Sequence, residues 1–313
     1  MSSRSVGIVI LNWNGIEDTI RCLSSLGESD LEDISVYIVD NGSKNAEAAS
    51  LALKFPWTIV LPQEENQGYC GGNNIGIRRA LTDGVDYVVL LNNDTIIPPN
   101  AITTLVSEFK KIPGAGAISP VVILGEDLAG SAFIRSEWRP EIAEFSLNPD
   151  NQSYLDVKDL PPWRSEWAYG CCLLTSASVL DEVGFLDERY FAYFDEADWC
   201  WRLADAGYYS YVSPAAFIFH LSGNRPNYSR VATYLRTRNR LLWMKENLSR
   251  KRRSRSFGYL FRELIWHSLN FAGLIRNSSY SYGTDTSRAY LLGWYDYQRG
   301  RSGRWDDQDF FEN

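Results

Sequence analysis

The sequence predicts an α/β protein built on a mostly parallel, doubly wound sheet, and three observations lead to that class. Short apolar runs of strand length alternate with amphipathic stretches of helix length over residues 6–124. The runs are apolar on both faces, which is typical of strands buried between two layers of helices. Three of the runs end in polar clusters, and ligands bind at the carboxyl edge of such sheets. This alternation is the pattern of parallel strands joined by crossover helices.

The elements follow one another in a regular order. The expected strands of the first half lie at residues 6–12, 36–39, 57–61, 87–91 and 115–124. The expected helices lie at 17–26, 46–54, up to about 81 after a glycine-rich loop at 66–74, and 98–111 with a proline in its first turn. Further on we expect a strand at 167–175, helices at 176–183 and 195–206, closing strands at 208–213 and 216–221, and helices over 231–275.

Charge divides the chain into two parts. Residues 1–223 carry 14 Lys and Arg against 31 Asp and Glu, whereas residues 224–304 carry 17 against 4. We therefore expect one α/β domain over 1–223 and a basic helical region over 224–313, with a mobile acidic tail at 305–313. The basic region indicates an anionic partner: a membrane surface, a phosphorylated acceptor, nucleic acid or the acidic part of the same chain.

Composition favours a cytoplasmic protein. The first five residues are polar and Val6 already begins a strand, so no signal peptide is expected. No apolar window is long enough for a transmembrane helix. The five cysteines show neither CxxC spacing nor pairing with histidine, which indicates reduced thiols.

The strand at 87–91 ends in Asn92, Asn93 and Asp94. At the carboxyl edge of a parallel sheet, Asp94 would project an oxygen ligand into the ligand crevice, with the two amides beside it. Hard oxygen donors of this kind suit Mg²⁺ or Mn²⁺ holding a diphosphate. The alternative is a polar turn that caps the next helix.

Two other strands end in similar clusters, Asn12-Trp13-Asn14 and Asp40-Asn41, so the pattern indicates a nucleotide pocket. Asp40 could accept hydrogen bonds from a ribose or base, although its Asp-Asn-Gly-Ser context is also an ordinary turn. The glycine-rich loop has glycines at 68, 71, 72 and 76, which matches neither the dinucleotide fingerprint nor the P-loop. It still allows close backbone approach to a negatively charged ligand at a helix N-terminus.

A second cluster of acids, Asp195, Glu196 and Asp198, follows an aromatic run at the start of a helix. A carboxylate held against an aromatic wall can act as a general base, and Asp195 or Glu196 is expected to face the cavity. The alternative role is N-terminal capping. Asp198 and Arg202 are spaced for a pair within the helix. His220 ends a strand and is a candidate metal ligand, although a single histidine is more often structural.

Two further regions carry weaker patterns. Residues 128–164 are interrupted by prolines, and we expect an insertion or an acceptor-side loop. The basic cluster 250–255 is expected between two amphipathic aromatic helices, where it forms either a membrane-surface patch or a solvated turn.

Taken together, the motifs resemble the inverting family-two glycosyltransferases with the GT-A fold, particularly their rhamnosyltransferase-like branch. The ordered matches are VGIVILNWNG, VDNGS, NQGYCGGNNIG, LLNNDT, YFDEADWCWRL and the later His220; the RNRL segment at 238–241 is also similar.

The resemblance implies specific roles. Leu11, Trp13 and Asp40 would contact the nucleoside, and Gly72 and Asn73 would line the donor pocket. Asp94 would bind the metal, completed by His220. Glu196 would be the base that deprotonates the acceptor hydroxyl, with Asp195 beside it. The implied donor is a nucleotide-diphosphate sugar such as dTDP-rhamnose or a UDP-sugar, and the implied acceptor is a saccharide or a lipid-linked molecule.

Two departures from the family pattern matter. Asn92 stands where the family has its first metal-site Asp, and the family's Glu-Asp pair is inverted to Asp195-Glu196. A nucleotidyltransferase with a similar sheet is the first alternative. Such an enzyme would need a Gly-rich loop with basic residues directly after the first strand, where this chain has Asn12-Trp13-Asn14-Gly15. A nucleic-acid-binding protein is the second, and the acidic charge of residues 1–223 argues against it. We therefore expect no nucleic-acid partner, and peripheral contact with the inner face of a membrane through the basic region.

Overall fold

The computed structural model describes residues 5–30, 33–142, 144–147, 152–221, 230–274 and 284–304. The strands are β1 (Val6–Asn12), β2 (Ile34–Asp40), β3 (Ile59–Pro62), β4 (Tyr87–Asn92), β5 (Thr95–Ile96), β6 (Ala115–Leu124), β7 (Ala132–Phe133), β8 (Ser136–Arg139), β9 (Glu144–Leu147), β10 (Trp163–Ser165), β11 (Cys172–Ser176) and β12 (Tyr209–His220). The helices are α1 (Ile16–Leu26), α2 (Glu47–Lys54), α3 (Gly68–Thr82), α4 (Ala101–Lys111), α5 (Tyr154–Val157), α6 (Ala177–Val183), α7 (Asp195–Asp205), α8 (Arg230–Asn247), α9 (Arg250–Phe271) and α10 (Thr284–Gln298).

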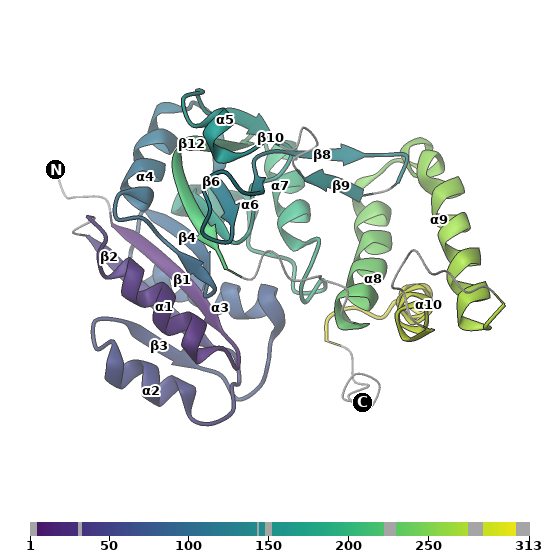
Figure 1. The fold of residues 1–313 in the computed structure, drawn as a ribbon, viewed down its shortest axis with the longest axis horizontal. Coiled ribbons are helices and arrows are strands. Elements are labelled where there is room, and N and C mark those ends of the chain that lie inside the picture. Colours follow the sequence, from purple (N-terminus) through teal and green to yellow (C-terminus); the bar gives the residue numbers. More distant parts are fainter. Residues whose placement is uncertain are drawn as a thin grey trace.

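One large sheet with helices on both faces forms the centre of the molecule (Figure 1). Side chains alternate along each strand, so neighbouring residues enter different layers. In β1, Ile8 and Ile10 pack in the layer covered by α1, α2 and α4, whereas Val9 packs in the layer covered by α3, α6 and α7. Strands buried on both faces explain why the apolar runs of the sequence show no alternation.

The first half of the sheet is parallel, as predicted. β3, β2, β1 and β4 lie in that order, and β1 pairs in parallel with both β2 and β4. The crossover helices return the chain to the same edge each time. All carboxyl ends of these strands therefore meet on one side of the sheet.

The second half of the sheet is mixed. β6 does not pair with β4, because β11 lies between them and runs antiparallel to both. β12 pairs with β6 in parallel, and β5, β7 and β10 add antiparallel edges. The sheet is thus mostly parallel along its main path, with late segments of the chain inserted into it.

The helical C-terminal region packs on the side of the sheet that carries α7. α8 packs against α10, and α10 against α9, which lies at the outer margin of the molecule (Figure 1). Trp243 and Met244 of α8 belong to the same hydrophobic cluster as α3 and α7. The hairpin of β8 and β9 also packs on α8, because Trp138 and Phe145 both contact Trp243. The expected domain boundary at 223 lies outside the described residues.

Several predicted boundaries were wrong. α3 already begins at Gly68, so most of the expected glycine-rich loop is helical, and both prolines before α4 precede that helix. The strand expected over 167–175 is only β11, and the two closing strands are one strand with a register shift between Ser213 and Phe217. The basic cluster 250–255 lies within the first turns of α9, not between helices.

Residues 128–164, expected as an insertion or an acceptor-side loop, contain short strands and the single-turn helix α5. Beyond α9, the chain forms the helix α10. The expected tail at 305–313 lies outside the described residues. No helix in the described ranges combines the length and apolar character needed to cross a bilayer.

Candidate active site

Three neighbouring strands, β2, β1 and β4, end side by side at one edge of the sheet. In their parallel register Asn12 lies beside Asp40, and Leu11 lies beside Asn92. The polar ends of these strands therefore meet, as the strand pattern predicted. The side chains at this edge nevertheless have different tasks, because some face solvent and others are tied within the protein.

Asn12 is a buried anchor that joins two strand ends to a helix. Its side-chain amide donates to the carboxylates of Asp40 (3.0 Å) and Glu47 (2.9 Å) and to the hydroxyl of Ser43 (3.1 Å). Its side-chain oxygen accepts a hydrogen bond from the Thr19 hydroxyl at 2.7 Å. Asn12 is fully buried, and its hydrogen bond fixes the position of the Asp40 carboxylate.

Trp13 follows Asn12 and turns outward at the same edge. Its side chain is 56% exposed, whereas Asp40 is almost fully buried. The exposed indole offers a stacking surface of the kind that a nucleoside uses, and the adjacent strand end carries the Asp40 carboxylate.

The start of α3 is bound to the β2 end by Asn41. The Asn41 amide donates to the side-chain oxygen of Asn66 (3.0 Å) and to the backbone oxygen of Gly68 (3.1 Å). Its oxygen accepts from the backbone N–H of Gln67 at 2.9 Å. Asn73 is also buried, and its amide donates to the Tyr69 carbonyl. These predicted donor-binding residues therefore act here as supports for the first turn of α3.

Glycines allow that turn to approach its neighbours closely. A Cβ at Gly72 would lie 2.3 Å from Cδ1 of Leu11, and one at Gly68 would lie 2.5 Å from the Phe191 side chain. Gly68 also has a φ of +74°, a conformation that favours glycine. The structure thus gives both glycines a packing reason, and it connects α3 directly to the segment that precedes α7.

Asp94 and His220 form the predicted pair. Nε2 of His220 lies 3.0 Å from Oδ1 of Asp94, and both side chains are largely buried. The contact follows from strand pairing, because β5 places Thr95 opposite His220, and the Leu221 N–H donates to the Asp94 carbonyl. Two residues that are 126 positions apart in the sequence thereby meet at the site.

The pair fits a divalent cation in the chemistry of its donors. Carboxylate oxygen suits Mg²⁺ and Mn²⁺, and imidazole nitrogen is acceptable to the softer of the two. Within the described ranges, no cluster of three or more His, Cys, Asp and Glu side chains could hold a metal ion. A cation bound here would therefore take two protein ligands and complete its coordination with water or substrate oxygen.

The two asparagines before Asp94 differ in their surroundings. The Asn93 amide donates to the Thr19 hydroxyl at 2.9 Å, which ties it to α1. The backbone of Asn92 is fixed from both sides: its N–H donates to the Cys171 carbonyl, and its carbonyl accepts from the Thr95 hydroxyl. The side chain of Asn92 is only half-buried.

Asp94 and the candidate base Glu196 both lie near one short backbone segment. This segment, residues 169–171, is joined to the end of β4 by the hydrogen bond between Asn92 and Cys171. The Glu196 side chain lies over Gly170, where an added Cβ would fall 2.2 Å from Oε1 of Glu196. Gly170 thus provides the space that Glu196 occupies. Asp94 and Glu196 are therefore near the same segment and do not lie on opposite sides of the molecule.

Burial changes the acidity of this pair. Asp195 is 1% exposed, and burial raises the pKa of its carboxyl well above the usual range, with the Glu196 charge raising it further. Burial also raises the pKa of Glu196, while its own backbone N–H and the Arg236 guanidinium oppose the increase. Two neighbouring acids with raised pKa values are typical of groups that exchange protons during catalysis.

The turn before the acids is strained. Phe191, Tyr193 and Phe194 have φ values of +67°, +67° and +68°, which bulky residues rarely adopt. Phe194 is the residue that immediately precedes α7, so the strain lies next to Asp195. Backbone strain of this kind persists only where the surrounding structure enforces it, and it is common at functional sites.

α8 supplies residues whose role at the site the sequence analysis missed. Asn239 is fully buried, and its amide donates to the carbonyls of Tyr190, Ala192 and Tyr193. The Arg236 guanidinium lies over the Tyr193 ring, 5.0 Å from its centroid. The sequence signal was present in the RNRL segment, but nothing local connected it to residues 190–193.

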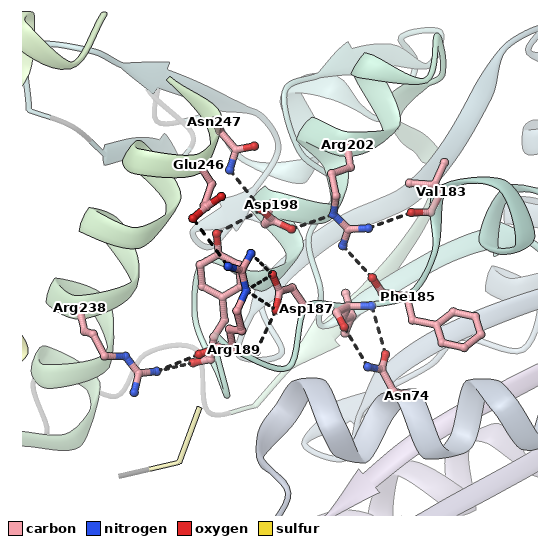
Figure 2. A network of polar contacts seen from close by, with 12 residues as sticks. Asn74, Val183, Phe185, Asp187, Arg189, Asp198, Arg202, Arg238, Glu246 and Asn247 are labelled. Carbon is pink, nitrogen blue, oxygen red and sulfur yellow. Dashed lines mark hydrogen bonds and ion pairs between the residues drawn. The ribbon is translucent and has the colours of Figure 1, made fainter. Parts of the chain in front are cut away.

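Asp198, the acid that was predicted to pair with Arg202 within the helix, has a structural role. Asp198 accepts hydrogen bonds from Arg202 (2.9 Å), the Tyr190 hydroxyl (3.1 Å) and the Asn247 amide (3.1 Å). Figure 2 shows this network, in which Arg202 also reaches the carbonyls of Val183 and Phe185. The predicted Asp198–Arg202 pair is confirmed, and it holds α7 in place.

Comparison with known proteins bears on the fold and on the class of protein that this chain resembles. Residues 7–155 match the family described as glycosyl transferase family 2. An N-acetylglucosaminyl-diphospho-decaprenol L-rhamnosyltransferase of Mycobacterium tuberculosis is 29% identical over 219 residues, covering 64% of this chain and 70% of that protein. The dTDP-rhamnosyl transferase RfbF of Shigella flexneri is 25% identical over 191 residues, covering 58% of this chain and 61% of RfbF.

Among solved structures, the crystal structure of GalNAc-T7 with UDP, GalNAc and Mn²⁺ superimposes with a TM-score of 0.59 at 15% identity. The alignment covers 96% of this chain and 58% of that one, and it shows a shared fold. The match of residues 7–155, the rhamnosyltransferase relatives and this shared fold together support the resemblance to rhamnosyltransferase-like glycosyltransferases of family 2 with the GT-A fold.

Proposed function

We propose that this enzyme transfers a sugar from a nucleotide-diphosphate donor to a saccharide or lipid-linked acceptor by direct displacement with inversion. The observation that carries the proposal is that the Asp94–His220 pair and the Glu196 carboxylate both lie near residues 169–171. Single displacement needs a cation-binding pair and a proton acceptor close to one another, and these residues supply both.

The donor is proposed to bind at the ends of β1 and β2. The exposed Trp13 ring and the fixed Asp40 carboxylate support contact with a nucleoside, with Leu11 at its side. A dTDP-rhamnose or UDP-sugar donor is supported by the name of RfbF and by the UDP in the GalNAc-T7 structure. The decaprenol-linked substrate in the name of the mycobacterial relative supports a lipid-linked acceptor.

Asp94 and His220 are proposed to hold Mg²⁺ or Mn²⁺, and the crystal structure of GalNAc-T7 with Mn²⁺ supports a divalent cation on this fold. When bound, the cation supplies positive charge that stabilises the diphosphate leaving group. Asn92 replaces a charged ligand with a neutral amide, so we expect weaker metal affinity than an acid at this position would give, or a ribose contact instead.

Glu196 is proposed as the base, with Asp195 as the alternative. The carboxylate takes the proton of the acceptor hydroxyl while the acceptor oxygen bonds to the anomeric carbon from the face opposite the diphosphate. The bond between the anomeric carbon and the diphosphate oxygen breaks in the same step, and the electron pair leaves with the diphosphate. Because there is one displacement, the configuration inverts. A retaining route would need a second carboxylate across the sugar.

Two substitutions test this proposal. Glu196→Gln keeps the shape of the side chain but cannot accept the proton, so kcat should fall roughly 10²–10⁴-fold while nucleotide binding stays nearly intact. Asp94→Ala should remove the Mn²⁺-dependent increase in melting temperature that the donor nucleotide produces, since a ligand stabilises only the state that it binds. Asp205→Asn, an exposed acid at the end of the same α7, is the matched control. Normal transfer rates in both variants would contradict the assignment of the site.

We also propose that the enzyme is cytoplasmic and contacts the inner face of a membrane through α9. Phe257, Phe261, Ile265 and Leu269 are all exposed and recur every four residues, so they form one stripe along this helix. Basic side chains of the same helix are also exposed to solvent: Arg250, Lys251, Arg252, Arg255 and Arg262. An apolar stripe on a helix rich in exposed cations suits an anionic lipid surface.

A further inference from the structure

The strained turn over residues 190–194 determines where the candidate acids lie. Three of its residues have positive φ values, and α7 begins directly after them with Asp195 and Glu196. If the turn relaxed to ordinary negative φ values, the first turn of α7 would rotate and both carboxylates would move. The position of the acids therefore depends on the groups that hold this backbone.

Those groups come from two sides. On one side, the N–H of Cys70 in α3 donates to the Phe191 carbonyl at 3.1 Å, and the Phe191 ring fills the space at Gly68. On the other side, Asn239 of α8 donates to the carbonyls of Tyr190 (2.8 Å), Ala192 (2.7 Å) and Tyr193 (2.9 Å). One amide thus binds three of the carbonyl groups that the strained backbone leaves outside regular structure.

Arg238 fixes the orientation of that amide. Its guanidinium donates from Nε (3.0 Å) and Nη2 (2.9 Å) to the side-chain oxygen of Asn239, so the nitrogen of the amide must face the turn. The same guanidinium reaches the carbonyls of Tyr190 (3.0 Å) and Arg189 (3.3 Å), and Figure 2 shows Arg238 pointing from α8 toward Arg189. Both side chains are almost fully buried. They lie far beyond the acids in the sequence and act on them only through the turn.

We infer that Asn239, oriented by Arg238, is a positioning residue for sugar transfer: it holds the strained 190–194 turn and thereby fixes the positions of Asp195 and Glu196. The inference rests on the proposed function for the role of the two acids. α8 is then a part of the catalytic apparatus, although it lies in the basic C-terminal region and outside the segment that matches the family.

Asn239→Asp is the sharpest test. It keeps the size of the side chain and the oxygen that Arg238 binds, but it replaces the donating nitrogen with an oxygen that repels the three carbonyls. With dTDP-rhamnose as donor we expect kcat to fall about 10²-fold with little change in the KM for the donor, since a displacement of about 1 Å at the reacting groups has this effect. Hydrogen exchange at the amides of residues 194–198 should accelerate, while exchange in β1 and β4 stays unchanged.

Asn74→Asp is the matched control. Asn74 is an equally buried asparagine of α3, and its amide donates to the Leu186 carbonyl and the Glu188 carboxylate, just before the same turn. Its substitution should lower the melting temperature to a similar degree but leave kcat and the exchange at 194–198 near wild type at temperatures where the protein is folded.

The outcomes separate the possibilities. A kcat at the wild-type level in Asn239→Asp, unchanged exchange at 194–198, or an equal loss of kcat in both variants would overturn the inference. The exchange measurement needs no substrate, so it also decides the matter if dTDP-rhamnose is not turned over. In that case faster local exchange in Asn239→Asp alone supports the positioning role, while the proposed function fails separately.

Discussion

Asp195 is a residue of the site whose ionised form is unfavourable. The carboxyl is buried at the start of α7, and neither of its oxygens has a hydrogen-bond partner of good geometry among the described residues. Burial and the neighbouring Glu196 charge raise its pKa well above the usual range. The titratable and charged groups near the pair include Tyr69 and Cys70 of α3, Tyr169 and Cys171 of residues 169–171, Asp198 and Cys200 of α7, and Arg236 of α8. Of these only Arg236 is positive at neutral pH.

The sign of the resulting pH dependence follows from linkage. Because the folded state binds the Asp195 proton more tightly than the unfolded state does, this group favours folding below its unfolded pKa of about 3.8. That stability is lost as the pH rises toward the raised folded pKa. We expect Asp195→Asn to remove this loss, so its melting temperature should exceed that of the wild type by several degrees at pH 7 and converge with it near pH 4.

The measurement is a pair of thermal unfolding series between pH 4 and pH 8. Asp205→Asn on the exposed end of α7 is the control and should follow the wild type at every pH. A wild-type melting temperature in Asp195→Asn across the whole range would show that the carboxyl is not held in an unfavourable environment.

Gly170 gives a second prediction at this scale. A methyl group there would overlap the Glu196 side chain, so Gly170→Ala should displace the candidate base and lower kcat by about 10²-fold. Gly27→Ala is the control, since its added Cβ would meet no atom closer than 3.4 Å. Steady-state kinetics with the donor that binds best in a thermal-shift screen provide the test. Equal kcat values in the two variants would contradict the proposed position of Glu196.

Residue-scale roles were only partly accessible from the sequence. The pairing of Asp94 with His220 was predicted, and the structure brings them together. The roles of Gly170 and Asn239 were not predicted, because each depends on a contact with a distant segment that no local pattern encodes. Asp195 is fully buried, whereas Glu196 is only partly buried. The structure does not otherwise explain why the order of the two acids is inverted.

At the scale of the elements, hydrogen bonds from buried side chains join the ends of neighbouring strands. Asn12 connects β1 to β2 and to the start of α2 through three donated hydrogen bonds. Asn12→Ala would leave two buried carboxylates, Asp40 and Glu47, without that donor. Each loss of a buried partner costs ~1–3 kcal/mol, so the melting temperature should fall by several degrees.

Donor affinity should fall in the same variant, because Asp40 would no longer be fixed beside Trp13. Isothermal titration with UDP and Mn²⁺ measures this effect, and Asn74→Asp serves again as a buried-asparagine control away from the strand ends. Unchanged affinity together with reduced stability would assign Asn12 to the fold alone.

Element boundaries show where sequence patterns fail. The apolar runs located the central strands, because a strand that is buried on both faces is apolar at successive positions and is therefore easy to recognise in the sequence. The runs carried no information about neighbours, so the insertion of β11 between β4 and β6 could not be foreseen. The glycines of α3 suggested a loop, yet tertiary contacts with Leu11 and Phe191 make glycine necessary inside a helix.

At the scale of the whole molecule, charge and exposed apolar surface are unevenly distributed. The acidic α/β part carries the site, and the basic helices lie to one side, with α9 at the margin (Figure 1). The division in charge belongs to the sequence itself, and the structure has helices where the sequence predicted amphipathic aromatic helices. The sequence pattern placed the basic cluster between helices, because the boundary between α8 and α9 at Ser249 has no glycine or proline to mark it.

We expect the protein to co-sediment with phosphatidylglycerol vesicles and to bind phosphatidylcholine vesicles much more weakly. Binding should fall steeply with salt, since exposed charges are screened beyond roughly 10 Å at about 0.1 M ionic strength. The double variant Phe257→Ser with Phe261→Ser should lose most of the binding. Leu53→Ser, which changes an exposed leucine of α2 far from α9, should not.

Two results would count against this surface. Equal binding of the Phe257/Phe261 double variant and the wild type would exclude α9 as the contact. A change in oligomeric state in the double variant, without any vesicle binding by the wild type, would assign the stripe to contact between copies of the chain.

The position of β11 has a consequence for how the protein is made. Synthesis proceeds from the N-terminus, so β4 and β6 leave the ribosome well before residues 172–176, the only described segment that joins them. Until then both strands present bare edges that are open to pairing with other nascent chains. The sheet is completed only when residues 170–176 have been made, and this stretch begins with Gly170, over which the Glu196 side chain lies.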